Sequence, residues 1–284
     1  MVLNENEGGV KIQGRRINNL RFADDIDLIE ENRERRQESL TQLTEAGEKT
    51  GLEINISKTK TMVNGRKDTE EEQLSIKNKM IENITELVYL GSLITEDNDG
   101  RLREELQGQQ ELWNSLKRSG ETRILAREPN LKKLKATVMS VVMYASETWT
   151  LKKKDRDRLL VFKMKCYRRI LRIRWEQKIM KKCTEECNAG RTSYWIMERK
   201  LNLFGHICRM KDNRLVKEVM FGTMEGELRR GRPCREWLDD MGGEKIHILN
   251  RKAQDHGTWR TVVRTALDTY GRWVHGAMKD EWIW

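Results

Sequence analysis

The sequence predicts an α+β protein in which a small part built from hairpins precedes a long helical part. Three observations lead to this fold class. Short alternating apolar runs are confined to about the first hundred residues, helical spacing of apolar residues dominates afterwards, and the chain is 35% charged with only two prolines. Ordinary soluble domains are roughly 25% charged, so we expect charge-rich helices that pack along narrow apolar stripes.

The first elements follow from the spacing of apolar residues. Across Arg15–Glu30, two short apolar runs meet at an acidic pair, a pattern that predicts a hairpin. Apolar residues at helical spacing then predict a helix over Arg33–Lys49, with Gly51 placed to end it. Alternation predicts further β structure over Leu52–Ile56 and over Leu87–Thr95, separated by a charged stretch that is helical or irregular.

Strand patterns stop at about residue 101. Helical spacing predicts helices over Leu102–Leu116 and Leu131–Ala145, and the turn residues at 97–100 mark the best domain boundary. We therefore expect one region over residues 1–100 and a mostly helical one over residues 101–284. The nine tryptophans should mostly fill space between helices, because large rings supply buried area in a weakly hydrophobic chain.

Composition also bears on location. No run approaches the roughly 18 apolar residues of a membrane span, and the N-terminal residues lack the pattern of a signal peptide. The five cysteines are irregularly spaced, as expected for reduced thiols rather than a disulfide framework. These features predict an intracellular protein, cytoplasmic or nuclear, with no membrane partner.

Four residues have the right chemistry for zinc, namely Cys183, Cys187, His206 and Cys208. The first two have an ordinary spacing for a ligand pair, but His206 and Cys208 are separated by one residue only. Zinc therefore competes with a simpler interpretation, in which His206 packs within a helix.

The net charge of +10 is concentrated in one segment. Between Leu151 and Trp175 there are eleven Lys or Arg residues against two acidic ones. Drawn as a helix, this segment places five cations on one face: Lys154, Arg158, Lys165, Arg169 and Arg172. The adjoining side gathers Leu159, Phe162, Cys166, Ile170 and Ile173. The cationic face predicts contacts with nucleic-acid phosphates, and a solvated helix surface is the alternative.

A second basic element is the tetrapeptide Arg230-Gly231-Arg232-Pro233. An extended segment of this kind is narrow enough to place Arg230 and Arg232 in an A·T-rich minor groove, and it looks like the core of an AT-hook. A basic loop preceding a helix is the alternative interpretation.

The acidic pair lies in the quartet Phe22-Ala23-Asp24-Asp25. Two adjacent carboxylates at a hairpin tip suit a divalent metal, because Mg²⁺ prefers hard oxygen ligands and bridges to phosphates. Aspartate is also a favoured turn residue for local reasons, so the quartet alone leaves both interpretations open.

Three segments occur in a fixed order: RINNLRFADDIDLI, GLEINISKTKTMV and LVYLGSLIT. They resemble motif C, motif D and the primer-grip hairpin of the reverse transcriptases of non-long-terminal-repeat (LINE-type) retrotransposons. Further matches resemble the helical thumb and C-terminal region of the same elements: YASETWTLKKKDRDRLLVFKMKCYRRILRIRW, LNLFGHICRM and LRRGRPCREWLDDM. The resemblance covers nearly the whole chain.

The resemblance implies an RNA-directed DNA polymerase with a partial palm over residues 1–100 and a thumb and basic region over residues 101–284. It implies that Asp24 binds catalytic Mg²⁺, that Asp25 lies beside the same ion, and that Lys58 lies near the incoming nucleotide. The implied partners are an RNA template and a DNA primer, or another nucleic acid.

One departure from the family pattern limits the expected activity. The motif C match begins within the first two dozen residues, so we expect neither the fingers nor the motif that supplies the second catalytic aspartate. The sequence therefore predicts a truncated retrotransposon product that is inactive alone. The alternative is a non-enzymatic nucleic-acid-binding protein that retains the basic helical region.

Overall fold

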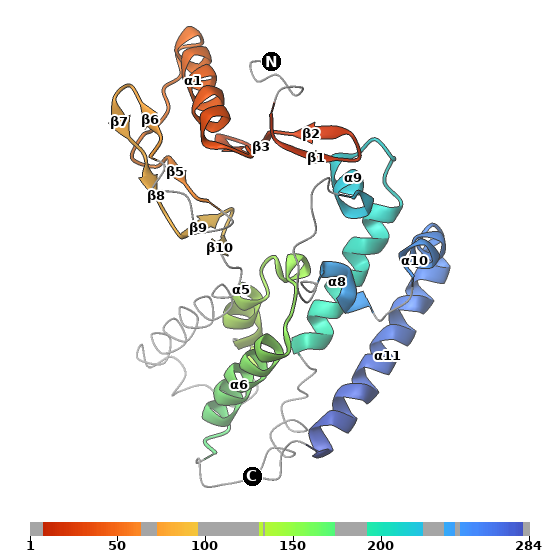
Figure 1. Ribbon diagram of the computed structural model, residues 1–284. Coiled ribbons are helices and arrows are strands. Elements are labelled where there is room, and N and C mark those ends of the chain that lie inside the picture. The colour runs from red at the N-terminus through yellow and green to blue at the C-terminus, as the bar shows by residue number, and fades with distance from the viewer. Residues whose placement is uncertain are drawn as a thin grey trace. The chain divides into compact units, whose positions relative to one another are not determined.

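The computed structural model describes residues 8–63, 73–95, 131–132, 134–173, 192–223, 236–241 and 245–280. Hairpins come first and helices follow, which confirms the predicted α+β class (Figure 1). The chain divides into two compact units: Met1–Asn98 with Lys211–Gly231, and Asp99–Met210 with Arg232–Trp284. Within the described ranges, no helix is long and apolar enough to cross a lipid bilayer.

The described strands of the first unit form two-stranded sheets. The antiparallel pairs are β1 (Val10–Ile12) with β2 (Arg15–Ile17), β3 (Asn19–Phe22) with β4 (Asp25–Leu28), β6 (Ser75–Ile76) with β7 (Lys79–Met80), and β9 (Glu86–Tyr89) with β10 (Ser92–Thr95). The remaining pair is parallel, β5 (Lys60–Thr61) with β8 (Glu82–Asn83).

The predicted acidic hairpin is formed by β3 and β4, and the predicted β structure near residue 90 is the hairpin β9–β10. Because β3 and β4 pair only with each other among the described strands, both outer edges of this sheet lack a neighbouring strand. Apolar side chains there stay accessible: Leu20 is 38% exposed, Ile26 40% and Phe22 60%.

The predicted helix is present as α1 (Arg33–Lys49). The Asn32 side chain caps it by accepting a hydrogen bond from the backbone amide of Arg35 at 3.0 Å, and Gly51 follows its end with φ +75°. Leu40 on α1 packs into a small core with Leu74, Ile76 and Ile81. This core supports the hairpins from one side.

The strand predicted over Leu52–Ile56 is wrong. Asn55 instead organises a turn, because its carbonyl accepts from the amides of Lys58 at 3.1 Å and Thr59 at 3.0 Å. The Asn55 side chain accepts from the Ser57 hydroxyl at 2.7 Å. Asparagine favours such local side-chain bonds, which here outweigh the apolar alternation. Leu52 is left 69% exposed.

The sequence patterns gave no indication of the hairpin β1–β2 or of its companion α9 (Leu215–Phe221). The Arg15 guanidinium pairs with the Glu218 carboxylate at 2.8 Å. Gly222, just after α9, lies against the side chain of Ile12, where a Cβ would collide. These contacts join residues about two hundred positions apart, a separation that no local pattern records.

The described elements of the second unit are helical. They are the π-helical turn η1 (Lys135–Met139), α5 (Ser140–Val142), the short 3₁₀ helix η2 (Ser146–Thr148), α6 (Lys153–Ile170), α8 (Thr192–Cys208), the 3₁₀ helix η3 (Trp237–Met241), α10 (Ile246–Ala253) and α11 (His256–Asp280). The helix predicted over Leu131–Ala145 corresponds to η1 and α5. The one predicted over Leu102–Leu116 lies outside the described residues.

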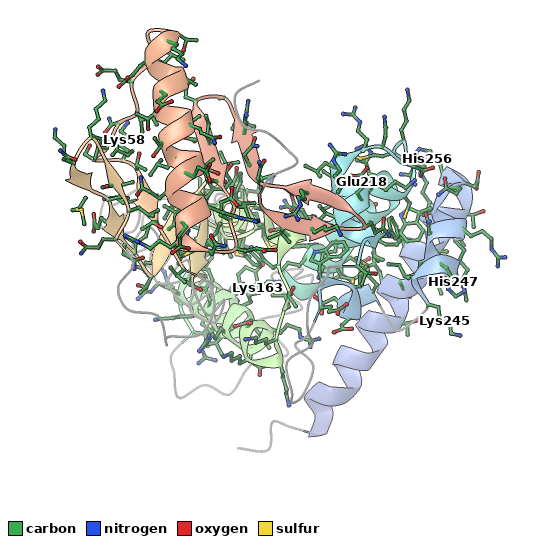
Figure 2. All side chains as sticks on the ribbon, turned by 45° about the horizontal axis from the view of Figure 1, so that its top comes forward. Lys58, Lys163, Glu218, Lys245, His247 and His256 are labelled. Carbon is green, nitrogen blue, oxygen red and sulfur yellow. The ribbon has the colours of Figure 1, made fainter. Side chains whose placement is uncertain are left out.

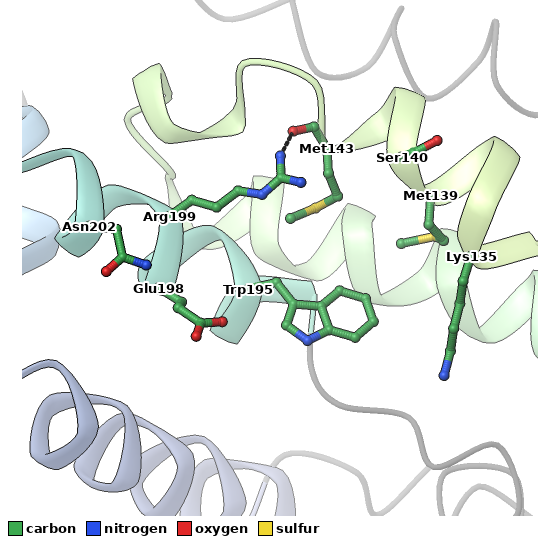
Figure 3. Close-up of a pocket in the computed structure, with 8 residues that line it drawn as sticks. All are labelled: Lys135, Met139, Ser140, Met143, Trp195, Glu198, Arg199 and Asn202. Atoms are coloured by element: carbon green, nitrogen blue, oxygen red, sulfur yellow. Dashed lines mark hydrogen bonds between the residues drawn. The ribbon is translucent and has the colours of Figure 1, made fainter. Parts of the chain in front are cut away.

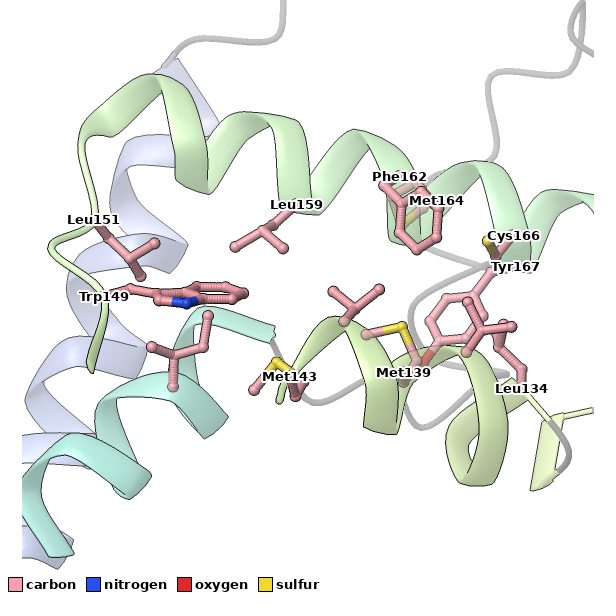
Figure 4. Packing of buried hydrophobic residues seen from close by; sticks show 13 residues of the cluster. Leu134, Met139, Met143, Trp149, Leu151, Leu159, Phe162, Met164, Cys166 and Tyr167 are labelled. Carbon is pink, nitrogen blue, oxygen red and sulfur yellow. The ribbon is translucent and has the colours of Figure 1, made fainter. Parts of the chain in front are cut away.

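The main core of the second unit is formed by α6 packing against η1 and α5 (Figure 4). Its buried members are Leu134, Val138, Met139, Val142, Met143, Trp149, Leu151, Leu159, Phe162, Met164, Cys166, Tyr167 and Ile196. A second contact joins α8 to α11, which lie side by side. There the ring centroids of Phe204 and Trp259 are 5.6 Å apart. Gly205 has no side chain and so leaves the space that the Trp259 indole occupies.

A buried lysine connects several of these elements. Lys200, on α8, is 1% exposed, and its ammonium binds the Asp240 carboxylate at 2.5 Å and the carbonyl of Trp149 at 2.8 Å. The ammonium also donates to the carbonyl of Trp237 at 3.1 Å and lies 4.7 Å from the centroid of that ring. One cation thus fixes α8, η3 and the segment leading into α6.

Replacing Lys200 should destabilise the protein strongly. Lys200→Met would leave the buried Asp240 carboxylate without its cation, and losses of about 3–5 kcal/mol are usual for such changes. Chemical denaturation followed by circular dichroism measures the free energy of unfolding. The exposed Lys154→Met is the control, with an expected change within about 0.5 kcal/mol. Adding Asp240→Asn to Lys200→Met should recover part of the loss, and equal stability of Lys200→Met and the control would contradict this role.

Candidate functional site

The acidic hairpin has a two-residue turn. Phe22 pairs directly with Asp25, so Ala23 and Asp24 form the turn itself, with Ala23 at φ +50°. Asp24 and Asp25 are both exposed. The tight turn therefore presents two adjacent carboxylates at the accessible tip of the hairpin.

Strand register places a third carboxylate on the same side as Asp25. Side chains alternate between the faces of a strand, so Asp25 and Asp27 share one face. On the neighbouring strand, Phe22 is paired with Asp25 and Leu20 with Asp27. Desolvation raises the pKa of Asp27, the nearby negative charge of Asp25 raises it further, and a hydrogen bond from the Tyr89 hydroxyl opposes both effects. Asp27 is therefore a partly buried carboxylate on the strand just behind the exposed tip.

Tyr89 lies on β9, so this hydrogen bond joins the two hairpins that resemble motif C and the primer grip. Desolvation raises the pKa of the Tyr89 phenol, and the bond to Asp27 adds to the shift because it stabilises the protonated phenol. No local sequence pattern marks Tyr89 as the partner of an aspartate, because the two residues lie on separate hairpins. The only sequence indication of Asp27 was its two-residue spacing from Asp25 on a predicted strand.

Among the described residues, the three aspartates do not converge on one metal position. Mg²⁺ requires near-octahedral oxygen coordination, usually from carboxylates together with water or phosphate. Asp24 and Asp25 offer oxygens at the tip, but Asp27 is bonded to Tyr89, and no group of three metal-binding side chains converges within the described ranges. Any Mg²⁺ held by Asp24 and Asp25 would need further ligands from elsewhere.

Among the described residues, Lys58 is not part of a cluster of functional side chains. It is exposed on the turn organised by Asn55 (Figure 2). The resemblance implies a position near an incoming nucleotide, and that role stays a prediction.

The cationic face expected on α6 is exposed over most of its length. Lys154, Lys165, Arg169 and the following Arg172 are exposed, and the opposite side of the helix is buried. Leu159 is 1% exposed, Phe162 6% and Cys166 0%, and Ile170 and Ile173 are partly buried against the same core. The packing side is therefore as predicted, and it holds the cations toward solvent along a rigid helix.

Arg158 differs from the other members of the face. It is half-buried, and its guanidinium approaches the Asp155 carboxylate at 3.4 Å. Asp155 also accepts a hydrogen bond from the backbone amide of Lys152 at the start of α6. Arg158 is thus engaged in stabilising the first turns of the helix. Arg230 and Arg232 lie outside the described residues.

The buried environment of Lys163 was not predicted, whereas Cys166 is buried in the core as predicted. Lys163 is 2% exposed, and its ammonium lies 4.8 Å from the Trp195 ring centroid and 5.5 Å from that of Tyr167. Burial raises the pKa of the Cys166 thiol to about 12, which makes it a packing group rather than a nucleophile. One of its two aromatic partners, Trp195, lies more than thirty residues away, which explains why sequence spacing did not identify the environment of Lys163.

The zinc interpretation receives no support from its described members. Cys208 is fully buried and His206 is exposed, because residues two apart on α8 face different directions. The exposure of His206 also shows that the expected packed histidine is wrong. Cys183 and Cys187 lie outside the described residues.

Comparison with known proteins gives one informative match. No protein-family model matches the chain, and no solved structure matches it. Over 281 residues the chain is 26% identical to an uncharacterized transposon-derived protein of Caenorhabditis elegans, in an alignment that covers 90% of this chain and 98% of that protein. The chain is therefore distantly homologous to a transposon-derived protein.

The contact between Asp27 and Tyr89 can be tested by titration. Tyr89→Phe removes the hydrogen bond that lowers the pKa of Asp27, so this pKa should rise above its wild-type value. Asp25→Asn removes a neighbouring negative charge, so the pKa of Asp27 should fall. Carboxyl NMR titration of Asp27 in the three proteins measures both shifts. An unchanged pKa of Asp27 in Tyr89→Phe would contradict the contact between the two hairpins.

Proposed function

We propose that this chain is a retrotransposon-derived protein of reverse transcriptase ancestry that binds nucleic acid through α6 and does not synthesise DNA by itself. Homology to a transposon-derived protein along most of the chain supports the origin. The ordered resemblance to motif C, motif D and the primer grip supports the more specific ancestry, as does the bond from Tyr89 to Asp27, which brings the first and third of these segments together.

The observation that carries the binding proposal is the one-sided exposure of α6. Its buried side packs into the main core, so the helix is held in place before any ligand arrives. Its outer side presents Lys154, Lys165 and Arg169 to solvent, and the exposed Arg172 follows just after the helix ends. A fixed row of cations along one face can neutralise successive phosphates without contacting base edges, which gives salt-dependent binding with little sequence preference.

The acidic hairpin supports ancestry more than activity. A two-metal mechanism needs carboxylates that hold both ions around the attacking and leaving oxygens. Asp24 and Asp25 supply only part of such a set, and no third described side chain converges with them on one position. The proposed activity of the isolated chain is therefore binding, with the carboxylate pair left as a feature of the ancestral polymerase.

Polymerase activity has a direct test. The purified chain should extend no DNA primer on an RNA template with Mg²⁺ and all four deoxynucleotides, because its carboxylates do not complete a two-metal site. Denaturing gel electrophoresis measures extension, and Asp24→Asn is the matched control. Extension by the wild-type chain that disappears in this variant would overturn the proposed lack of catalysis and indicate that further ligands complete the site.

Binding should fall steeply with salt. Contact with four or five phosphates predicts a log-log slope of affinity against salt of about −3 for single strands. Reversing three exposed cations of α6, as Lys165→Glu, Arg169→Glu and Arg172→Glu together, should flatten this slope by about 2 and weaken all sequences equally. Fluorescence anisotropy with labelled oligonucleotides at several salt concentrations measures the slope.

A matched control separates the α6 face from general charge. Lys245, Arg260 and Arg264 are exposed cations of the same compact unit, located at α10 and α11. Their triple change to glutamate alters the net charge by the same amount and should leave the slope nearly unchanged. Equal effects of the two triple variants would show that binding follows diffuse charge rather than α6.

A further inference from the structure

A cavity of about 510 Å³ lies within the second unit, between α8 and the segment formed by η1 and α5 (Figure 3). Small-molecule sites in proteins usually fall between about 300 and 1,000 Å³, so the cavity is large enough for a ligand. Its lining combines a tryptophan with two methionines and several polar groups: Trp195, Met139, Met143, Lys135, Arg199 and Asn202.

The apolar part of this cavity suits a flat ring. Trp195 is half-buried, in contrast to Trp149 and Trp259, which are at most 5% exposed. Met139 and Met143 are each 3% exposed, and methionine thioethers pack adaptably against aromatic groups. The ammonium of Lys163 lies 4.8 Å from the Trp195 ring centroid, which holds the indole in place. The cavity therefore has an indole in a fixed position, next to two methionine side chains that can adapt their packing to a ring.

The polar part suits a phosphate beside that ring. Lys135 and Arg199 are exposed cations at the cavity, and the Glu198 carboxylate also lines it. The Arg199 guanidinium donates to the Met143 carbonyl at 2.5 Å and lies 3.9 Å from the Glu147 carboxylate, so the structure fixes its position while its side chain stays 46% exposed. A guanidinium fixed at one nitrogen retains other N–H donors for phosphate oxygens.

From this combination we propose that the cavity binds one base of a single-stranded nucleic acid, stacked on Trp195, with the adjacent phosphate near Lys135 and Arg199. The inference rests on the proposed function, because it deepens phosphate binding by α6 into recognition of unpaired bases. Stacking of this kind accepts any base, since each has a π-face.

Continuity with α6 favours a strand over a free nucleotide. Lys163, which positions Trp195, belongs to the same helix that carries the cationic face, and both helices pack into one core. A strand can use the cations of α6 and the cavity together, because both belong to the same compact unit, whereas a free nucleotide would use only the cavity.

The test compares two oligonucleotides of equal length and charge, one with bases and one abasic. The wild-type chain should bind the base-bearing strand about 5- to 100-fold more tightly at fixed salt, the range expected for aromatic stacking. Trp195→Leu should abolish this preference and leave the salt slope unchanged. Trp195→Phe, which keeps a ring, should retain part of the preference, and this variant guards against a general loss of folding.

Tyr144→Leu is the matched control, because Tyr144 is an aromatic residue of the same unit that is 56% exposed and does not line the cavity. It should keep the full preference.

Equal binding of both oligonucleotides by the wild-type chain would overturn the base-binding inference, while the salt dependence on α6 would still stand. Absence of binding to either strand would overturn the proposed function itself. Adenosine monophosphate that binds as tightly as the strand, with the same loss in Trp195→Leu, would assign the cavity to a free nucleotide and overturn the inference for strands.

Discussion

The second unit depends on the buried ammonium of Lys200. A lysine taken out of water must regain its lost hydration from fixed partners, and here these are the Asp240 carboxylate and the carbonyls of Trp149 and Trp237. The Asp240 carboxylate also accepts from the amide of Leu151, just before α6. Because these partners lie on η3 and on the segment before α6, satisfying one cation sets the positions of α8, η3 and the approach to α6.

This constraint has consequences for function. It fixes α8, and Trp195 and Arg199 are on that helix. It also fixes the segment before α6, and the remaining length of α6 is then held by Leu159, Phe162 and Cys166 in the core. The row of exposed cations and the cavity are therefore parts of one rigid arrangement. Preorganised cations lose less conformational entropy on binding phosphate than mobile ones do.

The first unit rests on a much smaller core around Leu40 and on short paired strands. In this unit, the side-chain hydrogen bond between Tyr89 and Asp27 joins two hairpins that lie about sixty residues apart in the sequence. The tip carboxylates Asp24 and Asp25 remain exposed and incompletely surrounded. Metal catalysis needs ligands from several elements at once, and among the described residues no third metal-binding side chain converges on this tip.

The sequence by itself determined the features that depend on local spacing. It specified α1 with its glycine end, the hairpins β3–β4 and β9–β10, and the division of α6 into a packed and a cationic side. Periodicity is sufficient there, because residues within a turn or a strand pair are close both in sequence and in space. Local patterning failed at Asn55, where a side-chain turn replaced the expected strand.

Only the tertiary structure decided which residues meet. The partners of Lys200, the stacking of Lys163 on Trp195, the bond from Tyr89 to Asp27 and the ion pair of Arg15 with Glu218 each join distant segments. None has a sequence signature, because the burial that forces a charged group to find a partner arises only when the chain has packed. Packing also decided the environments of two tryptophans: Trp195 lines a cavity, whereas Trp149 is buried in the core.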